Sequence, residues 1–317
     1  MAEKSKQGKV SREVTSHRDW MSQLPLELHG VPLFKLALPG SHDSMSYDLD
    51  INSSIIEPDR LKRFSRIYCA RRMVLRWAVT QEETITKQLD AGVRYFDMRV
   101  ARKPNDPNPT RLFFYHGLYT RTDVESVLRM VNEWAETHPK EILILALSHF
   151  KEMDKHLHQH LINFIKTLFR TKLFPPKETP TLKSCWDKDR NIIVSYDYQH
   201  HQAELWGKIR YFYGKSMNPA EVEAELTRVL EKSRPSKGFF VCGLNLTLPD
   251  DVRILRYILR LCDNLANVIQ RSLPRLLQWV EDQAAKTPVN IIASDLVTRD
   301  DFVSIIIKQN IQKNWEV

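Results

Sequence analysis

The chain has 317 residues, of which 42% are hydrophobic and 27% charged, a composition typical of a soluble globular protein rather than a disordered or fibrous one. Its formal net charge of +8 favours anionic partners, such as nucleic acid, anionic lipid surfaces or phosphorylated substrates. The four cysteines show no CxxC spacing, which argues against a zinc ribbon, a thioredoxin-like motif and a disulfide framework, and fits reduced thiols in the cytosol.

The N-terminal segment is polar. Its sequence, MAEKSKQGKVSREVTSHRDW, lacks the apolar stretch of a secretory signal, and Ala2 stands where N-myristoylation requires glycine. The longest apolar runs, such as ILILAL at 142–147, are too short to cross a bilayer. We therefore expect a cytoplasmic protein with a polar, flexible leader over residues 1–18 and one domain over residues 19–317.

Short apolar runs alternate with longer amphipathic segments after the leader. Most of these runs are continuous, which is typical of parallel strands that are covered on both faces. The expected strands are 33–38, 93–100, 112–115, 142–148, 191–196, 239–247 and 289–294, with a weaker extended segment at 209–214. The expected helices are 82–91, 121–139, 153–169, 218–232 and 273–286, and the helix at 121–139 is expected to begin after an N-cap at Thr122.

This order of elements predicts an α/β fold with a parallel sheet. Seven or eight strands in about 280 residues fit a single (β/α) barrel better than a doubly wound sheet. We find no linker or internal repeat that divides the chain. With 9 glycines, the sequence also lacks the GxGxxG and Walker-type phosphate loops.

Polar residues recur where the apolar runs end. In a barrel these ends meet at one rim, which is where active sites are built. Each residue alone has a structural explanation, because a single histidine is commonly a core or turn residue and an aspartate commonly caps a turn. The residues at these ends are Ser41-His42-Asp43, Asp97 and Arg99, Tyr115-His116, Ser148-His149, Tyr196-Asp197, Asn245 and Ser294-Asp295.

Two histidines, several carboxylates and an arginine together form a chemically coherent set. One histidine can act as a base and the other as an acid, and carboxylate neighbours orient the rings. An arginine can bind a phosphoryl group whose negative charge grows in the transition state. The set therefore predicts cleavage of a phosphodiester, without a requirement for a metal.

The segments LPGSHDS, QLDAGVRYFDMRV and FYHGLYT resemble, in this order, the X region of phosphatidylinositol-specific phospholipases C. The resemblance is greatest to small eukaryotic proteins that consist of little more than this region, and it covers most of residues 20–310. It implies an irregular TIM-type barrel, which in this family is not always fully closed. It also implies cleavage of phosphatidylinositol to diacylglycerol and an inositol phosphate through a cyclic 1,2-phosphate.

The resemblance assigns roles to five residues. His42 would be the general base for the inositol 2-hydroxyl, and His116 the general acid for the leaving diacylglycerol oxygen. Asp43 would orient His116, and Asp295 would support His42. Arg99 would stabilise the charge that develops on the phosphoryl group.

Two positions separate this chain from the large calcium-dependent members of the family. By this resemblance, those enzymes have a His-Asn pair in the first segment and two acidic metal ligands, two residues apart, in the second. At the corresponding positions this chain has Asp43 and Asp97-x-Arg99. A guanidinium at a ligand position opposes Ca²⁺ binding. The chain therefore follows the bacterial, metal-independent pattern, and we expect no metal and no other cofactor.

Further residues are expected to bind the substrate. A sugar-like ring requires hydrogen-bonding side chains and an aromatic surface. The candidates for inositol contacts are Asp97, His149, Tyr196, Asp197 and Tyr198.

The segment at 59–79, DRLKRFSRIYCARRMVLRWAV, is basic and amphipathic. Such a helix can lie on an anionic membrane, with Arg71, Arg72, Arg76 and Trp77 as contact residues. The alternative is a solvated helix that packs its apolar stripe on the barrel. We find no motif for binding nucleic acid.

Three classes of function stay open at this point. The first is a phosphoinositide phosphodiesterase, a hydrolase of lipid degradation and signal transduction. The second is a glycerophosphodiester-type phosphodiesterase on the same barrel, whose metal-ligand set Arg99 disfavours. The third is a non-catalytic lipid-binding or scaffold protein, against which the intact His42, His116 and Arg99 argue. We expect a monomer that binds phosphatidylinositol or a related anionic phospholipid and associates peripherally with membranes.

Overall fold

The computed structural model describes residues 17–199, 201–249, 257 and 263–312. Parallel strands form a curved sheet in the order β6-β5-β2-β1-β9-β8-β7. An antiparallel hairpin of β3 and β4 extends from the C-terminal half of β2. The strands are β1 Leu38–Ser41, β2 Tyr95–Arg102, β3 Leu112–His116, β4 Leu118–Asp123, β5 Leu143–Lys151, β6 Ile192–Tyr196, β7 Arg210–Tyr213, β8 Phe240–Gly243 and β9 Ile291–Ser294.

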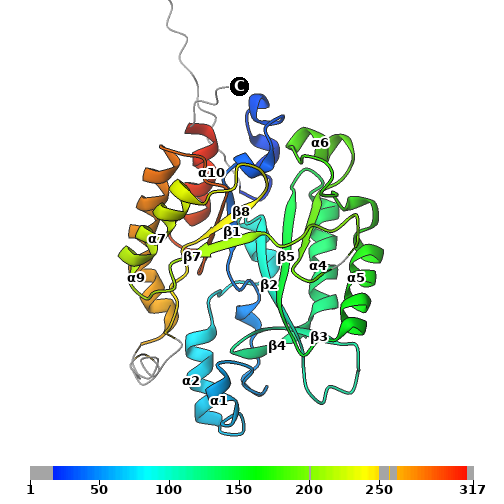
Figure 1. The fold of residues 1–317 in the computed structure, drawn as a ribbon, viewed down its shortest axis with the longest axis vertical. Coiled ribbons are helices and arrows are strands. Elements are labelled where there is room, and N and C mark those ends of the chain that lie inside the picture. The colour runs from blue at the N-terminus through cyan, green and yellow to red at the C-terminus, as the bar shows by residue number, and fades with distance from the viewer. Residues whose placement is uncertain (1–16, 200, 250–256, 258–262, 313–317) are drawn as a thin grey trace, which may run out of the picture.

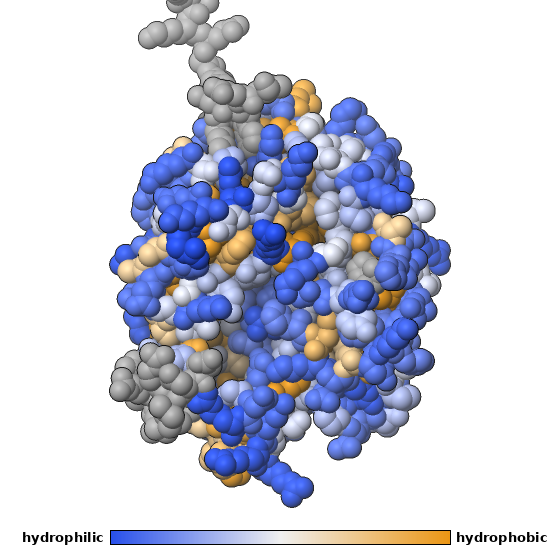
Figure 2. All heavy atoms as spheres, in the orientation of Figure 1, coloured by the Kyte–Doolittle hydropathy of each residue, from blue (hydrophilic) through white to orange (hydrophobic). Residues whose placement is uncertain are grey.

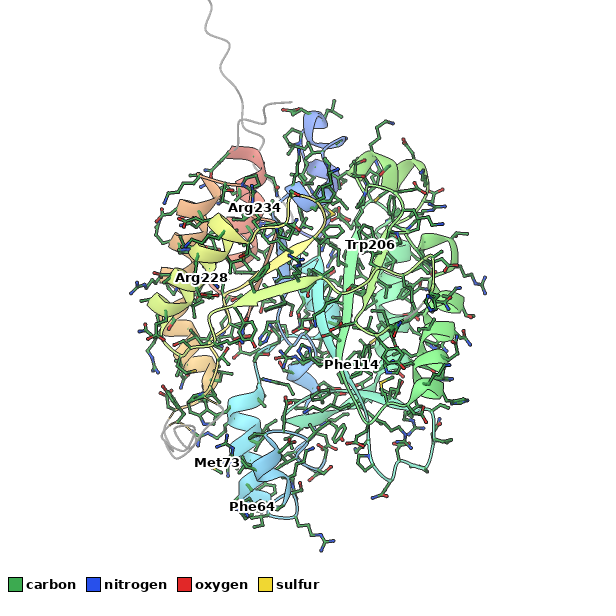
Figure 3. All side chains as sticks on the ribbon, in the orientation of Figure 1. Phe64, Met73, Phe114, Trp206, Arg228 and Arg234 are labelled. Carbon is green, nitrogen blue, oxygen red and sulfur yellow. The ribbon has the colours of Figure 1, made fainter. Side chains whose placement is uncertain are left out.

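The sheet does not close on itself. In the described part of the chain, no ladder joins β6 to β7, and the segment around Trp206 lies beside β6 instead. The Trp206 amide donates to the Val194 carbonyl at 2.8 Å, and its indole nitrogen donates to the Phe174 carbonyl at 2.7 Å (Figure 3). The fold is thus the irregular, incompletely closed TIM-type α/β barrel that the sequence predicts.

Helices cover the outside of the sheet. Figure 1 shows α4, α5 and α6 on one side of the strands and α7, α9 and α10 on the other, while α1 and α2 project at the lower end. In the described residues, no helix is both long enough and apolar enough to cross a bilayer. The helices are α1 Asp59–Lys62, α2 Tyr68–Ala78, α3 Ile85–Asp90, α4 Val124–Thr137, α5 Lys155–Phe169, α6 Leu182–Asp187, α7 Pro219–Lys232, α9 Leu265–Ala284 and α10 Phe302–Gln312.

Two hydrophobic clusters matter for the site. The main core fills the barrel and the space under its helices, and the central strands contribute fully buried residues such as Phe96, Leu145 and Ile292. A small separate cluster lies under α2, where Val74 and Ala78 pack with Ile55 from the preceding loop. The segment from α1 to α2, which we call the α1–α2 hairpin, is therefore anchored by a core of its own.

Four expected boundaries were wrong for identifiable reasons. The strand expected at 33–38 begins at Leu38, because 33–35 form a 3-10 turn, and the Leu33 carbonyl of this turn accepts from the Asn290 side chain. The basic helix expected over 59–79 is broken into α1 and α2. The α4 helix is capped by Asp123 rather than Thr122, because the Asp123 carboxylate accepts from the Ser126 amide. The helix expected from residue 273 begins at Leu265 and includes Pro274 in its interior.

Most of the expected 1–18 leader lies outside the described residues. Within the described part, Arg18 forms an ion pair with Asp90 at 2.9 Å.

Candidate active site

The end of β1 begins the candidate site. His42 and Asp43 follow Ser41, and both side chains are buried, with 7% and 3% of each residue exposed. Asp43 has a φ of 43°, which turns the chain away from the sheet, and Gln81 holds this turn by donating to the His42 carbonyl at 2.9 Å. Aspartate tolerates this left-handed conformation better than most residues. The turn therefore fixes both side chains at the C-terminal end of the barrel strands.

His42 has a partner on each ring nitrogen. Its Nδ1 lies 2.7 Å from Asp295 Oδ1. Its Nε2 lies 3.1 Å from the Arg99 guanidinium and 3.1 Å from Asp43 Oδ2. The neutral ring can accept from Arg99 through Nε2, and the protonated ring can form an ion pair with Asp43. Nε2 is thus supported in both protonation states.

The electrostatics of His42 follow from these neighbours. Burial alone would lower its pKa, but the carboxylates of Asp43 and Asp295 outweigh burial and raise the pKa to about 9. Burial would raise the pKa of Asp43, yet Arg99 and the two histidines lower it. Burial raises the pKa of Asp295, although its ion pair with His42 opposes the change.

His116 ends β3 and faces His42 across the site. Its Nδ1 lies 2.7 Å from the Ala78 carbonyl of α2, and its Nε2 lies 3.3 Å from Asp43 Oδ2. The two imidazole centroids are 6.3 Å apart. Asp43 was expected to serve His116 rather than His42, but its Oδ2 lies within ion-pair distance of both rings. A single carboxylate therefore connects the two histidines.

Arg99, on β2, completes the cluster. Its Nε lies 2.7 Å from Asp43 Oδ1, and a terminal nitrogen lies 3.7 Å from Asp97 Oδ2. Burial would lower its pKa, but Asp43 and Asp97 outweigh burial and raise it, so the guanidinium is charged. His42, Asp43 and Asp97 offer ligand atoms within 4.8 Å of one another, as a metal site would. In this protein, a permanent cation from Arg99 already lies against all three residues.

A cavity of about 660 Å³ opens over this cluster, and Figure 2 shows the surface hollowed above the α1–α2 hairpin. Two predicted substrate-binding residues, His149 and Asp197, line this cavity, as Asp97 does. Burial lowers the pKa of His149, and the Arg99 charge lowers it further. These three residues are thus close enough to the catalytic candidates to contact the same ligand.

Two other predicted substrate contacts, Tyr196 and Tyr198, do not line the cavity. Successive side chains of a strand point to opposite faces, and on β6 Ser195 faces the cavity. Tyr196 therefore points toward the helices, where its hydroxyl lies 2.9 Å from His158 Nδ1. Tyr198 stacks on the same His158 ring at a centroid distance of 3.6 Å. In this structure both tyrosines contact His158 and neither lines the cavity.

Three of the four predicted membrane contacts have structural roles. Trp77 is buried, with 4% exposed, and lines the cavity. Arg71 donates to the carbonyl groups of Ile51 and Ser65, and Arg76 donates to the Asp263 carbonyl. Of the four, Arg72 alone is exposed.

Several cavity residues were missed by the sequence analysis. Lys151 forms a salt bridge of 2.9 Å with Glu57, and Lys208 forms one of 2.7 Å with Asp197. Tyr211, on β7, donates its hydroxyl to Asn245 at 3.0 Å. Lys151 lines the cavity although strict alternation from Ala146 and Ser148 would place it on the opposite face, because the β2–β5 pairing shifts register between Arg99 and Ala101. Its partner Glu57 is 94 residues away in the sequence, so no local sequence pattern could have predicted this contact.

The family model described as "Phosphatidylinositol-specific phospholipase C, X domain" matches residues 68–197, a range that includes Arg99 and His116. "PI-PLC X domain-containing protein 1" of Homo sapiens is 38% identical over 313 residues, covering 95% of this chain and 94% of that protein. The protein of the same name from Danio rerio is 37% identical over 291 residues, covering 89% and 92%. "PI-PLC X domain-containing protein 3" of Homo sapiens is 32% identical over 322 residues, covering 96% of each.

Among solved structures, a phosphatidylinositol-specific phospholipase C from Staphylococcus aureus superposes with a TM-score of 0.66 at 17% identity, covering 93% of this chain and 98% of that one. The enzyme from Listeria monocytogenes gives a TM-score of 0.63 at 20% identity, with the same coverage. At these identities, the likeness establishes the barrel fold.

Proposed function

The chain belongs to the family of proteins with a PI-PLC X domain, and we propose on this premise that it is a phosphodiesterase acting on phosphatidylinositol. The products are diacylglycerol and an inositol phosphate, formed through the 1,2-cyclic phosphate. One observation carries the proposal. Asp43 lies within 3.3 Å of the Nε2 atoms of both His42 and His116 and 2.7 Å from Arg99, so a base, an acid and a cation converge on one carboxylate.

His42 is the general base. Asp295 accepts from its Nδ1–H, so the lone pair of the neutral ring is on Nε2. With a pKa of about 9, this neutral ring is the minor form at pH 7 and becomes more abundant as the pH rises. Nε2 takes the proton of the inositol 2-hydroxyl while that oxygen forms a bond to phosphorus. Asp295 orients the ring and stabilises the imidazolium that results.

His116 is the general acid. The Ala78 carbonyl accepts from Nδ1–H, so the second proton of the protonated ring, the one that is transferred, is on Nε2, beside Asp43. As the bond between phosphorus and the glycerol oxygen breaks, this proton passes to the glycerol oxygen, and diacylglycerol leaves.

Arg99 stabilises the negative charge that grows on the non-bridging phosphoryl oxygens. Asp43 and Asp97 hold the guanidinium in place. Because Arg99 supplies the positive charge that Ca²⁺ would otherwise provide, we propose that the reaction requires no metal.

We further propose that the protein binds membranes peripherally through the tip of the α1–α2 hairpin. Two large apolar residues are exposed there, Ile67 at 51% and Tyr68 at 52%, and Arg66 and Arg72 are exposed beside them. Exposed apolar side chains among cations favour the interface of an anionic bilayer. Replacement of Arg72 with alanine should weaken sedimentation with anionic vesicles. The matched variant Arg129→Ala, on α4, should not, and equal binding by both variants would refute this role.

The proposed activity is tested with phosphatidylinositol vesicles in EDTA, by following the release of water-soluble inositol phosphates. The variants His42→Ala and His116→Ala should each lose at least about 100-fold in rate, the usual contribution of a general acid or base. The control His138→Ala, at the end of α4, should keep the wild-type rate. Equal turnover in all variants would refute the catalytic roles, and activity that EDTA abolishes and Ca²⁺ restores would refute the role of Arg99. A wild type that binds the vesicles without turnover would indicate a lipid-binding protein.

A further inference from the structure

One side of the cavity is apolar, and the proposed reaction leaves it without a role. It has two walls. The α1–α2 hairpin supplies the first, and residues 246–249, after β8, together with Leu265 of α9 supply the second. In Figure 2, hydrophobic atoms border the hollow on its lower side, above the hairpin.

The hairpin wall is built from Pro58, Leu61, Val74 and Trp77. Val74 and Trp77 are 6% and 4% exposed, which fixes the inner part of the wall, while Leu61 is half-buried. The tip of the hairpin, with Phe64 and Met73 labelled in Figure 3, lies at the lower end of the molecule, away from the barrel strands. The wall therefore extends from the catalytic cluster toward the edge of the molecule.

The second wall is built from Leu246, Leu248, Pro249 and Leu265. It is tied to the hairpin, because Arg76 of α2 donates to the carbonyl of Asp263, just before α9. The α2 and α9 helices are in direct contact. The two walls thus form a fixed apolar recess rather than two unrelated surfaces.

The recess is continuous with the acid side of the catalytic cluster. His116 is held by the Ala78 carbonyl of α2. The next residue, Gly117, has a φ of 71° and lies so close to Val74 that a Cβ on it would be 2.7 Å from Val74 Cγ1. The apolar wall therefore adjoins the ring that the proposed reaction assigns to the leaving group.

None of the residues that form the two walls of the recess is charged, which favours a neutral group in the recess. The lysine and arginine side chains among the described lining residues of the cavity are Arg99, Lys151 and Lys208. Each has a carboxylate partner, namely Asp43, Glu57 and Asp197, at 2.7, 2.9 and 2.7 Å. His42, with a pKa of about 9, is a further cation and lies between Asp43 and Asp295. Burial would raise the pKa of Glu57, but His116 and Lys151 lower it, so the pair with Lys151 is ionic. A fatty acid carboxylate would find no uncompensated cation here, whereas an acyl ester requires none.

We propose that this recess is an acyl subsite, which binds the ester groups and the first methylene groups of the acyl chains of the lipid. This inference rests on the proposed function and deepens it, because it assigns a place to the leaving group. Each methylene group that the recess removes from water strengthens binding about fourfold. The protein therefore selects a diacylated phosphatidylinositol over the deacylated head group, even in the absence of a membrane.

The test is a binding measurement on the His42→Ala protein, which holds the ligand without turnover. Calorimetry compares monomeric dihexanoyl-phosphatidylinositol, below its micelle concentration, with glycerophosphoinositol. Dihexanoyl-phosphatidylinositol should bind at least about tenfold more tightly, which corresponds to two or three buried methylene groups. Leu61→Ser and Leu248→Ser, introduced separately, should each reduce this advantage several-fold and leave the affinity for glycerophosphoinositol unchanged.

The control is Leu26→Ser, because Leu26 is 81% exposed and does not line the cavity. Unchanged binding of glycerophosphoinositol shows that each variant is folded. Equal affinity for the two ligands, or an advantage that Leu61→Ser and Leu248→Ser leave intact, would overturn the subsite. A failure of the proposed function has a different signature, namely an absence of hydrolysis by the wild type while the affinity difference persists.

Discussion

Replacement of Asp295 with asparagine should lower the pKa of His42 from about 9 to between about 7 and 8. The imidazole is buried, and its Nδ1 lies 2.7 Å from the Asp295 carboxylate. The rise from 6.5 to about 9 corresponds to about 3 kcal/mol in favour of the protonated ring. A hydrogen bond to a charged group contributes about 1.5–3 kcal/mol, so the loss of the carboxylate should remove half or more of the rise.

The assay is an NMR titration of the histidine side chains in both proteins. Asp123→Asn is the matched control, because asparagine can still cap α4 and the residue lies outside the cavity. The control should titrate like the wild type at His42. The Asp295 variant should also lose roughly 100-fold or more in turnover, because the ring is no longer held in the correct tautomer. A His42 that titrates near 6.5 in the wild type, or whose pKa is unchanged in Asp295→Asn, would refute this account of the base.

Three further predictions follow from the same geometry. Because the folded state raises the pKa of His42 from 6.5 to about 9, the protonated ring stabilises the folded protein fully below pH 6.5, and this stabilisation is lost as the pH rises through 9. The difference in thermal stability between wild type and His42→Gln should therefore shrink over this pH range. A constant difference would contradict the raised pKa. His116→Ala should lose at least about 100-fold on phosphatidylinositol but less than about tenfold on a nitrophenyl ester of inositol phosphate, because nitrophenolate leaves without a proton; equal losses would refute an acid role. Gly117→Ala should lower the free energy of unfolding in denaturant by about 1–3 kcal/mol, because Gly117 has a φ of 71° and lies close to Val74. The control Gly30→Ala should cost less, because nothing lies within 4 Å of a Cβ at Gly30. Equal costs would contradict the close packing of β3 on α2.

The catalytic candidates could be predicted from the sequence because strand ends are visible in it. A buried parallel strand is a continuous apolar run, so the first polar residues after it are easily recognised. His42 and Asp295 follow such runs and lie together because β1 and β9 are neighbours in the sheet. His116 was identified in the same way, because it follows the apolar run LFFY. The sequence of this run does not show that β3 is antiparallel to β2.

The residues that line the cavity were harder to predict, because they depend on which face of a strand a side chain occupies. A displacement of one position moves a side chain to the opposite face of the sheet, and this separates Ser195 from Tyr196. The charged pairs of the cavity depend on contacts between distant segments, as between Lys151 and Glu57. The basic stretch at 59–79 predicted a helix that lies on the membrane surface. The sequence pattern could not show that the apolar face of α2, including Trp77, instead lines the cavity and packs on the small core under the helix.

The most direct test of the central claim is phosphorus NMR of phosphatidylinositol during incubation with the protein in EDTA. The wild type should convert the phosphodiester signal into that of a five-membered cyclic inositol phosphate, because His42 activates the neighbouring 2-hydroxyl rather than water. The His42→Ala protein at the same concentration should leave the lipid signal unchanged on this timescale. A lipid signal that persists with the wild type, or an acyclic phosphate as its first product, would contradict the account.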